Sequence, residues 1–564
     1  MNTRKFLFAA GCAWYTSVTL LLAQSFNFPA SPKVEFTSSN LPILIINTHG
    51  QTILDEPKIT ADLGIIYNGP GVRNHLTDSL RHYNGKIGIE IRGSSSQMFP
   101  KKQYGIETRD ALGEDLDVAL LGMPKESDWV LSASYSDKTL LHNVLAFKLA
   151  NDLGHYASRT RYCEVILNGD YHGVYMLMEK IKRDKNRVNV SKMEAANIAG
   201  EAVTGGYIFK IDKTAGSSTQ GWYSAHLPYA DAWQKIYFQY DYPNEDDIVP
   251  EQKAYLQNYT RAFEDLMARA DYADPQNGYA QMLEVASFVD YFILQEIAHN
   301  VDGYRLSAFM HKDRDSQNPK LKMGPLWDFD LAFGNADYYD GANVNGLQVT
   351  FQVRSDAFQL PFWWTKFMQD SSFVNAIKAR WQQLREDVIT VPRVHAYIDS
   401  VANYLDEAQI RNFQRWPILG TYVWPNAYIG QTYGDELRHL KDWLQARILW
   451  MDLHIPELRA ANSEVAALPN GFALAQNYPN PLVAHRPGNL DQTATTITFR
   501  LEQAAMVALK IFDLSGREIA TLVEGELPAG AHERSLIANN LASGVYFYRL
   551  QVGGKVASRK LVIE

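Results

Sequence analysis

The stretch EIAHNVDGYRLSAFMHKDRDSQNPKLKMGPLWDFDLAFG, residues 296–334, contains the acidic positions around which we expect the fold to be organised. Asp302 stands in a polar break after a strongly apolar helical run. Alternating apolar residues then lead through a charged turn to Asp328 and Asp330, about 26 positions further on. The pattern predicts a helix, a loop acid, a hairpin and a second acid pair. An ordinary interpretation of the same acids, as helix caps or solvated turn residues, remains open.

This layout is typical of a site that transfers phosphate from a metal-bound nucleotide. One carboxylate orients the acceptor hydroxyl, while the other holds magnesium against the phosphates. A metal-dependent hydrolase that uses the same acids is an alternative, but no histidine-rich ligand set accompanies WDFD at 327–330. His299 fits better as a structural residue at a helix end than as a metal ligand.

Length and charge limit the possible classes of protein. A chain of 564 residues is too long for one hydrophobic core, so two or three domains are expected. The formal net charge of −9, without a basic stripe, argues against a nucleic-acid partner. Arg4 and Lys5 precede an apolar run ending near Ala23, which predicts a secretory signal peptide over residues 1–23. No later stretch is long and apolar enough to span a bilayer, so no transmembrane segment is expected in the mature chain.

The two cysteines predict no internal disulfide. Cys12 would leave with the signal peptide, so Cys163 is alone in the mature chain. Cys163 lies in a predicted strand, where we expect a buried, inert thiol rather than a nucleophile.

The first half of the chain has the pattern of a small β-rich lobe with one helix. The amphipathic helical pattern runs from Leu140 to Leu149, and a clear hairpin follows with its turn at Asn168 and Gly169. This order of elements would suit a nucleotide clamp. The other strand-like runs are LPILIINT (41–48), GIIYN (64–68), KIGIEIRG (86–93), FPKKQYGIETRD (99–110) and GYIFKID (206–212).

A small-residue turn, RGSSS at 92–96, joins two of these strands. Such turns let backbone amides approach an anionic ligand, and Lys101 or Lys102 on the next strand could reach its phosphates. An ordinary hairpin with a solvated lysine pair is the alternative.

The second half predicts a mostly helical lobe and then a separate β domain. Helical patterns dominate from about residue 250 to 455, and the aromatic run 362–364 fits a core or interface position. After a linker at 461–470, short strands separated by turn signals predict a small all-β sandwich over 471–564. The fold class expected is therefore α+β: a two-lobed domain over 24–460, followed by the sandwich.

Several stretches, in this order along the chain, resemble the CotH family of secreted, atypical protein kinases first known from spore coats. The resemblance runs from about Pro42 to the helices before Leu458. It implies a kinase-like fold, ATP, Mg²⁺ or Mn²⁺, and phosphorylation of Ser or Thr on secreted or surface proteins. The matching stretches are SSNLPILIINTHGQTI (38–53), IEIRGSSSQMFPKKQYGIET (89–108), DWVLSASYSDKTLLHNVLA (128–146), YHGVYMLMEKI (171–181), DGYRLSAFMHKD (302–313) and GPLWDFDLAFGNADYY (324–339).

The resemblance also implies roles for individual residues. Asp302 takes the place of the catalytic-loop acid, Asp328 that of the metal-binding acid, and Asp330 that of a possible second ligand. Lys102 takes the place of the phosphate-contacting lysine, with Lys101 the less favoured neighbour. The residues implied around the nucleotide are Arg92, Ser94 and Ser95 in the phosphate-side loop, Tyr175 to Glu179 at the adenine hinge, and Trp327 as an aromatic wall.

Two positions depart from the family pattern. Ser307 stands where kinases generally carry an asparagine that binds the second metal, and a hydroxyl is a weaker ligand for a hard cation. Either one metal suffices, another acid substitutes, or activity is reduced or lost. His142 stands where an arginine is expected. A catalytically inactive kinase-like scaffold that serves as a surface binding or structural protein is therefore the alternative function.

The C-terminal segment resembles the type A sorting domain of the type IX secretion system. This resemblance implies recognition by that secretion machinery, export across the outer membrane, and release or anchoring at the cell surface. It implies nothing about chemistry. The stretches that carry it are FALAQNYPNP (472–481), TTITFRL (495–501), VALKIFDLSGREI (507–519) and LASGVYFYRLQVGGKVASRKLVI (541–563).

Overall fold

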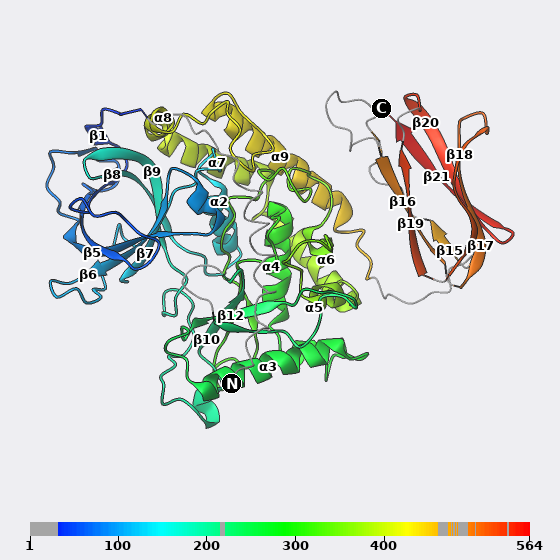
Figure 1. The fold of residues 1–564 in the computed structure, drawn as a ribbon, viewed down its shortest axis with the longest axis horizontal. Helices are drawn as coiled ribbons and strands as arrows, with labels where there is room; N and C mark the ends of the chain where they lie inside the picture. Colours follow the sequence, from blue (N-terminus) through cyan, green and yellow to red (C-terminus); the bar gives the residue numbers. More distant parts are fainter. Residues whose placement is uncertain are drawn as a thin grey trace, which may run out of the picture. The chain divides into compact units, whose positions relative to one another are not determined.

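The computed structural model divides the chain into two compact units, Met1–Ala460 and Ala461–Glu564. Figure 1 shows both units as ribbons. The signal peptide at 1–23, Cys12 and the linker at 461–470 lie outside the described residues, so their predictions stay untested. The described residues are 32–214, 220–460, 472–474, 477, 480, 482, 494–501, 503–528, 530–537 and 541–563.

A closed barrel of seven strands forms the first part of unit 1 (blue to cyan in Figure 1). Its first strand pairs in parallel with β8, and every other neighbouring pair is antiparallel. Closing the sheet removes its exposed edges, and alternate side chains fill the interior. The predicted β-rich first lobe is thus confirmed, as a barrel. Its order is β2 (Ile43–Asn47), β3 (Ile59–Ile66), β5 (Tyr83–Arg92), β6 (Gln103–Arg109), β7 (Asp128–Ser132), β9 (Asp170–Glu179) and β8 (Thr160–Leu167). A small pair, β1 (Ser38–Ser39) and β4 (Asn74–His75), lies outside the barrel.

Helix α4 (Val285–Ala298) is buried on nearly every face because its sequence is mostly apolar, and other helices of unit 1 pack against it. Trp363 and Trp364 are fully buried against Phe288 of α4, which confirms a core position for the aromatic run. The other helices are α2 (His142–Asp152), α3 (Pro250–Ala268), α5 (Phe362–Phe367), α6 (Ser371–Glu386), α7 (Val391–Tyr404), α8 (Asp406–Arg415) and α9 (Tyr433–His454), with short 3₁₀ turns at Ser95–Met98, Gly200–Val203, Tyr279–Gln281 and Gln348–Thr350.

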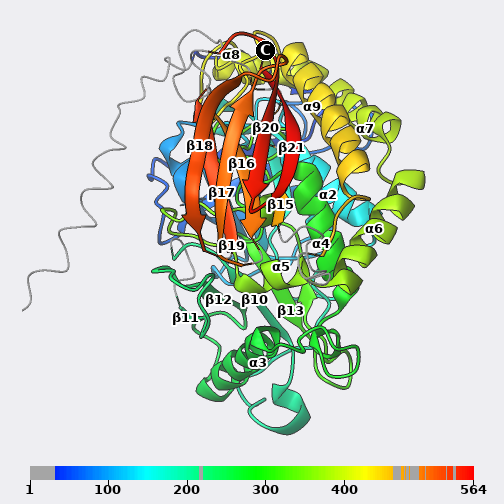
Figure 2. The same ribbon diagram turned by 90° about the vertical axis from the view of Figure 1, so that its right-hand side faces the viewer.

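The helical lobe also contains a five-stranded sheet, which the expectation of a mostly helical lobe did not include. Its central strand β10 (Tyr207–Ile211) pairs with β13 (Ala308–Lys312), about 100 residues later in the chain. Figures 1 and 2 both show β10 and β12 with α3 below them. The pairing is non-local, and the residue pattern of one strand does not indicate which other strand it pairs with. The sheet order is β11 (Gly221–Tyr223), β12 (Tyr237–Tyr242), β10, β13 and β14 (Lys322–Met323).

The second unit consists of two antiparallel sheets, as the predicted all-β domain requires. Residues from both sheets, among them Ile497, Leu509 and Leu550, share one hydrophobic cluster, so the sheets pack as a sandwich. One sheet contains β15 (Phe472–Leu474), β16 (Ala494–Leu501) and β19 (Gly530–Ile537). The other contains β18 (Glu518–Leu527), β17 (Ala505–Phe512), β20 (Gly544–Val552) and β21 (Lys555–Ile563).

Two sequence expectations concern single properties of the chain. Cys163 is a free, fully buried thiol, and burial raises its pKa to about 12, which agrees with an inert residue. In the described part of the chain, every helix is too short or too polar to cross a membrane.

Candidate active site

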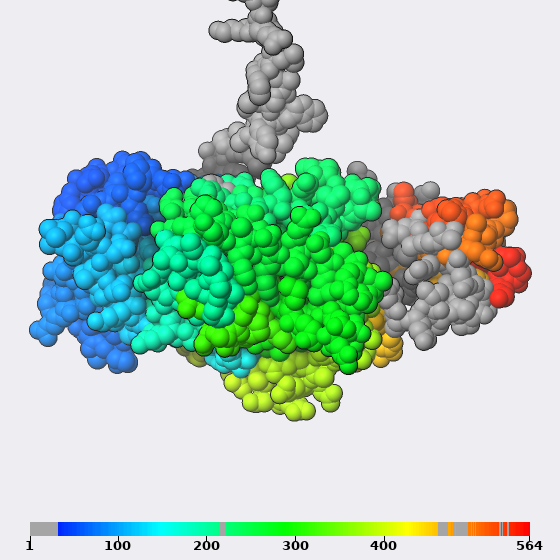
Figure 3. Space-filling view, turned by 90° about the horizontal axis from the view of Figure 1, so that it is seen from below, coloured from blue at the N-terminus to red at the C-terminus, as the bar shows by residue number. Residues whose placement is uncertain are grey.

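Asp302, Asp328 and Asp330 come together where loops leave the helical lobe. Asp302 follows α4, whose last turn ends at His299 in the left-handed conformation. Burial raises the pKa of Asp302, and the negative charges of Asp328 and Asp212 raise it further. This electrostatic interaction means that Asp302 and Asp328, distant in sequence, lie near one another. Figure 3 shows the part of unit 1 that contains these loops (green) beside the barrel (blue and cyan).

Asp328 and Asp330 form a close carboxylate pair. Although the Asp328 side chain is accessible to solvent, surrounding protein limits its hydration, and this desolvation raises its pKa well above the usual range. The charge of Asp330 and a hydrogen bond between the two carboxyl groups raise it further. Burial also raises the pKa of Asp330. Without a cation, the pair therefore tends to retain a proton.

The loop that contains this pair is fastened to the start of α2. The Phe329 amide donates to Asn143 Oδ1 at 2.7 Å, and Asn335 donates to the Asp330 carbonyl at 2.7 Å. His142 places Nδ1 3.2 Å from the same carbonyl. Asp328 itself has φ +66°, a conformation that aspartate tolerates better than bulky residues. His142 therefore performs a loop-holding role at the position where an arginine was expected.

Arg305 fixes the orientation of Asp302. Its Nη2 lies 3.3 Å from Asp302 Oδ1, and its Nη1 lies 3.1 Å from Asp356 Oδ2. Its Nε also donates to the Val301 carbonyl at 3.0 Å, and the guanidinium is almost fully buried. The positive charge of Arg305 lowers the pKa of Asp302 against the effect of burial. Arg305 was not among the residues predicted from the sequence, although its place three residues after Asp302 was an available signal.

Two further charged residues were also missed. Asp212 and Lys213 follow β10, and they act on both Asp302 and Asp328: Asp212 raises the pKa of each and Lys213 lowers it. The register pairs Ile211 with Ala308, so Asp212 directly follows this last pair on β10 and Ser307 directly precedes it on β13. The strand signal GYIFKID placed Asp212 at a strand end, but only the pairing with β13 brings it to the acids.

The barrel contributes residues to the same site from outside the helical lobe. Arg92 ends β5, and its guanidinium carbon lies 5.5 Å from the centre of the Trp327 ring. Burial lowers the pKa of Arg92, and the charge of Asp328 raises it, so both groups lie in one electrostatic environment. Ser94 and Ser95 are exposed in the connection between β5 and β6.

The two lysines of this connection differ in their surroundings. Lys102 is half-buried, and its Nζ donates to the Gln97 carbonyl at 2.5 Å, within the same connection. Lys101 is almost fully buried; its Nζ donates to the Val174 carbonyl at 2.5 Å and to Asn412 Oδ1 at 3.1 Å. Lys101, the less favoured neighbour, lines a narrow pocket together with Asp328 and Asp330, and Lys102 does not.

Glu179 ends β9, and its carboxylate is fully buried in an ion-pair network. Arg159 Nη1 lies 3.0 Å from Glu179 Oε1, and Arg187 Nη2 lies 3.2 Å from the same oxygen. This carboxylate already has its partners, so any contact of Glu179 with a nucleotide would come from its backbone. Ser307, with φ +48°, stands directly before β13.

Fold and site together define a mixed α+β protein with a β-barrel region, a helical region and a narrow polar pocket that Lys101, Asp328 and Asp330 line. The chain belongs to the CotH kinase family: the family model described as CotH kinase protein matches residues 89–451. The match begins later than the expected start near Pro42. A second model, described as secretion system C-terminal sorting domain, matches residues 477–564. Both predicted resemblances are confirmed, and the family implies a kinase-like fold. No curated protein matches the chain.

Proposed function

We propose that this protein transfers the γ-phosphate of ATP to Ser or Thr hydroxyls of secreted or cell-surface proteins. The observation that carries the proposal is the electrostatic effect of Asp328 both on Asp302, a loop acid distant in sequence, and on the barrel residue Arg92. Phosphoryl transfer depends mainly on positioning and charge neutralisation, and this set of groups suits both tasks.

The carboxylates fit a divalent cation. Asp328 and Asp330 would hold Mg²⁺ or Mn²⁺, because hard cations prefer carboxylate oxygens and would relieve the repulsion that raises both pKa values. Among the described residues, no three His, Cys, Asp or Glu side chains are grouped to hold a metal. Magnesium at nucleotide sites commonly keeps one or two protein carboxylates and completes its shell with water and phosphate oxygens. When bound, the cation neutralises phosphate charge.

Asp302 is the proposed base or orienting group for the acceptor hydroxyl. Its raised pKa makes it a better proton acceptor than a solvated aspartate, and Arg305 holds the carboxylate in one direction. Ser307 is a proposed weak metal ligand. Asp212, whose charge acts on Asp328, is the acid that we propose compensates for the missing asparagine.

The proposed nucleotide contacts come from the barrel side. Arg92 and the amides near Ser94 and Ser95 would face the phosphates, and Trp327 would border the nucleotide. Lys102 remains the proposed phosphate-contacting lysine. Lys102 would first give up its hydrogen bond to the Gln97 carbonyl in favour of a phosphate oxygen. Both residues are half-buried, so solvent reaches this hydrogen bond.

The direct test is transfer of label from γ-³²P-ATP by the full chain and by Asp302→Asn, with Mn²⁺ or Mg²⁺ present. Loss of the general base should lower the rate about 10²–10⁴-fold while the fold is retained. Asp399→Asn, which removes an exposed carboxylate on α7, is the matched control. Asp302→Asn protein that phosphorylates itself or a test substrate at the wild-type rate would refute the assigned role.

The second candidate is an inactive kinase-like scaffold at the cell surface, favoured by Ser307 in place of asparagine. Nucleotide-dependent stabilisation separates the two functions. Ligand at about 100 times its dissociation constant stabilises a protein by roughly 2.7 kcal/mol, which a melting experiment detects. A chain whose melting point does not change with any nucleotide and Mg²⁺ or Mn²⁺ would support the scaffold.

The C-terminal unit is a sorting domain and implies contact with secretion machinery. We propose that the machinery is the type IX system and that the protein reaches the cell surface or the medium. Deletion of residues 461–564 should leave the protein inside the cell envelope, as measured by immunoblots of medium, surface and periplasm. Export of the truncated chain at the normal level would contradict this proposal.

A further inference from the structure

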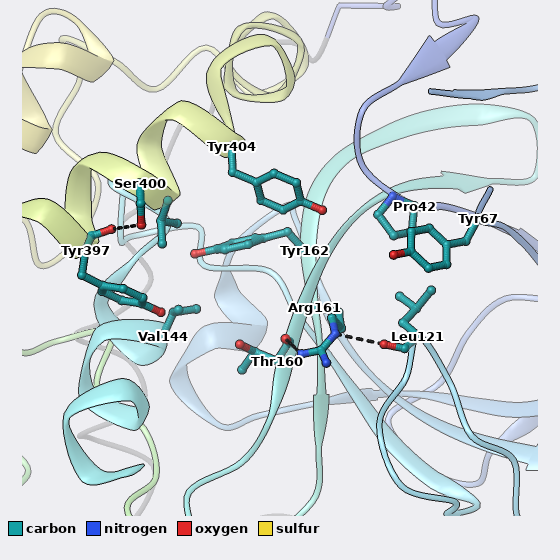
Figure 4. A pocket seen from close by; sticks show the side chains of 11 residues that line it. Pro42, Tyr67, Leu121, Val144, Thr160, Arg161, Tyr162, Tyr397, Ser400 and Tyr404 are labelled. Atoms are coloured by element: carbon teal, nitrogen blue, oxygen red, sulfur yellow. Dashed lines mark hydrogen bonds between the residues drawn. The ribbon is translucent and has the colours of Figure 1, made fainter. Parts of the chain in front are cut away.

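A second cavity in unit 1, of about 320 Å³, lies where the barrel meets α7. It shares no lining residue with the narrow pocket at Asp328, so it is separate from the proposed phosphotransfer site. Figure 4 shows its side chains, which come from β8, α2, α7 and the connecting segments at Pro42, Tyr67 and Leu121. The polar side chains of its wall belong to Tyr67, Thr160, Arg161, Tyr162, Tyr397, Ser400 and Tyr404.

Tyrosine rings dominate this cavity, and most of their hydroxyls are available. Tyr162 donates to the Leu140 carbonyl at 2.5 Å. Within the described part of the chain, the hydroxyls of Tyr67, Tyr397 and Tyr404 make no hydrogen bond. Figure 4 shows the hydroxyls of Tyr67 and Tyr404 turned toward each other. The cavity therefore offers apolar ring faces together with several free hydroxyls.

Arg161 supplies a positive charge to the same cavity. Its Nε donates to the Leu121 carbonyl at 2.9 Å and its Nη1 to the Thr160 carbonyl at 2.8 Å, and these bonds fix the guanidinium plane. In residues 32–214 and 220–460, no carboxylate lies within ion-pair distance of Arg161, and its Nη2 has no hydrogen-bond partner. The positive charge of Arg161 also lowers the pKa of Tyr404 against the effect of burial. An oriented guanidinium without a counter-ion is suited to a carboxylate.

We propose that this cavity binds a hexuronic acid residue, that is, a sugar ring with one carboxylate. Arg161 would pair with the carboxylate, while the tyrosine hydroxyls would bond the ring hydroxyls. The tyrosine rings and Leu121 would cover the apolar face of the sugar. A volume of about 320 Å³ lies at the small end of ligand sites and suits one ring.

The free hydroxyls favour a sugar over a flat aromatic acid. An aromatic acid could use Arg161, but its ring would displace water from the hydroxyls of Tyr67 and Tyr404 without offering them new hydrogen-bond partners. Leaving polar groups unpaired on binding is costly, whereas a ring that carries its own hydroxyls satisfies them.

The test is isothermal titration of the full chain with sodium glucuronate, glucose and 4-hydroxybenzoate. We expect glucuronate to bind and glucose to bind at least about tenfold more weakly, because it lacks the charged group. Arg161→Gln should weaken glucuronate binding about tenfold or more, and Tyr404→Phe, which removes one hydroxyl, several-fold. Arg261→Gln, on the exposed face of α3, is the matched control and should bind as the wild type.

The proposal is overturned if glucose binds as well as glucuronate, if 4-hydroxybenzoate binds more tightly than glucuronate, or if no probe binds. Unchanged glucuronate binding by Arg161→Gln would also overturn it. If Arg161→Gln does not fold, Tyr404→Phe decides, because Tyr404 is 44% exposed and loses only an oxygen. None of these measurements depends on phosphotransfer.

Discussion

Replacement of Glu264 by glutamine should make unit 1 more stable at alkaline pH. Glu264 lies on α3, is 2% exposed and accepts a hydrogen bond from Ser224 Oγ at 2.8 Å. Burial raises its pKa from 4.5 to about 7, although the bond from Ser224 lowers it. At pH values between 4.5 and about 7, this carboxyl group is therefore mostly protonated in the folded protein and mostly ionised in the unfolded chain.

The direction and magnitude of the change in unfolding free energy with pH follow from this pKa shift. Below pH 4.5 the carboxyl group is protonated in both states and has no pH-dependent effect. As the pH rises from 4.5 to 7, the folded state binds more protons than the unfolded state, so stability falls. The shift from 4.5 to about 7 is about 2.5 units. At 1.36 kcal/mol per unit it lowers the stability of the wild type by at most about 3 kcal/mol above pH 7. Glutamine does not titrate, so Glu264→Gln avoids this loss.

The assay is urea unfolding of the full wild-type and Glu264→Gln chains from pH 4.5 to 8.5, followed by tryptophan fluorescence. All 12 tryptophans lie at or before residue 450, so the signal reports unit 1 alone. The stability difference between variant and wild type should increase by about 3 kcal/mol in favour of glutamine across this range. A difference that stays constant with pH would refute the reasoning, because every other titrating group is common to both proteins.

Three further predictions concern the candidate site. Arg305→Lys should lower kcat more than it changes the KM for ATP, because one amine cannot hold both Asp302 and Asp356. A variant with the kcat of the wild type in a steady-state assay would contradict the orienting role. Nucleotide–Mg²⁺ affinity should rise with pH across the acidic range, because protons compete for Asp328 and Asp330, whose pKa values are raised; titrations that give one affinity at pH 5 and pH 8 would count against metal binding there. Gly93→Ala should destabilise the connection between β5 and β6 by about 1 kcal/mol or more, because Gly93 has φ +102° and a Cβ would lie 2.1 Å from Ser96 Oγ; an unchanged urea midpoint would show that the loop adapts freely.

Much of the fold could be predicted because the relevant signals are local. Strand alternation and the turn at Asn168 and Gly169 predict the β8–β9 hairpin, and the apolar run before Asp302 predicts α4. Asp302 could be found because it stands in a polar break after an apolar helical run, and Asp328 and Asp330 because they follow a strand-like segment and a charged turn.

The barrel closure, the five-stranded sheet and the partners of each charge were not predictable in this way. Nothing in the sequence of β10 indicates that it pairs with β13. The role of Arg305 is likewise not evident from the sequence, because its partner Asp356 is about 50 residues away along the chain. Lys101 and Lys102 are adjacent and chemically identical, yet one is buried between β9 and α8 and the other bonds its own loop.

The sequence by itself thus determined the order of many of the elements, the two-unit composition of the chain and the candidate acids, because periodicity, turns and motifs depend on neighbouring residues. Only the tertiary structure decided which of these groups act on one another. Burial and electrostatic interaction depend on distance in space. The effect of Asp328 on Asp302 and the cavity around Arg161 therefore exist only once distant segments have packed together.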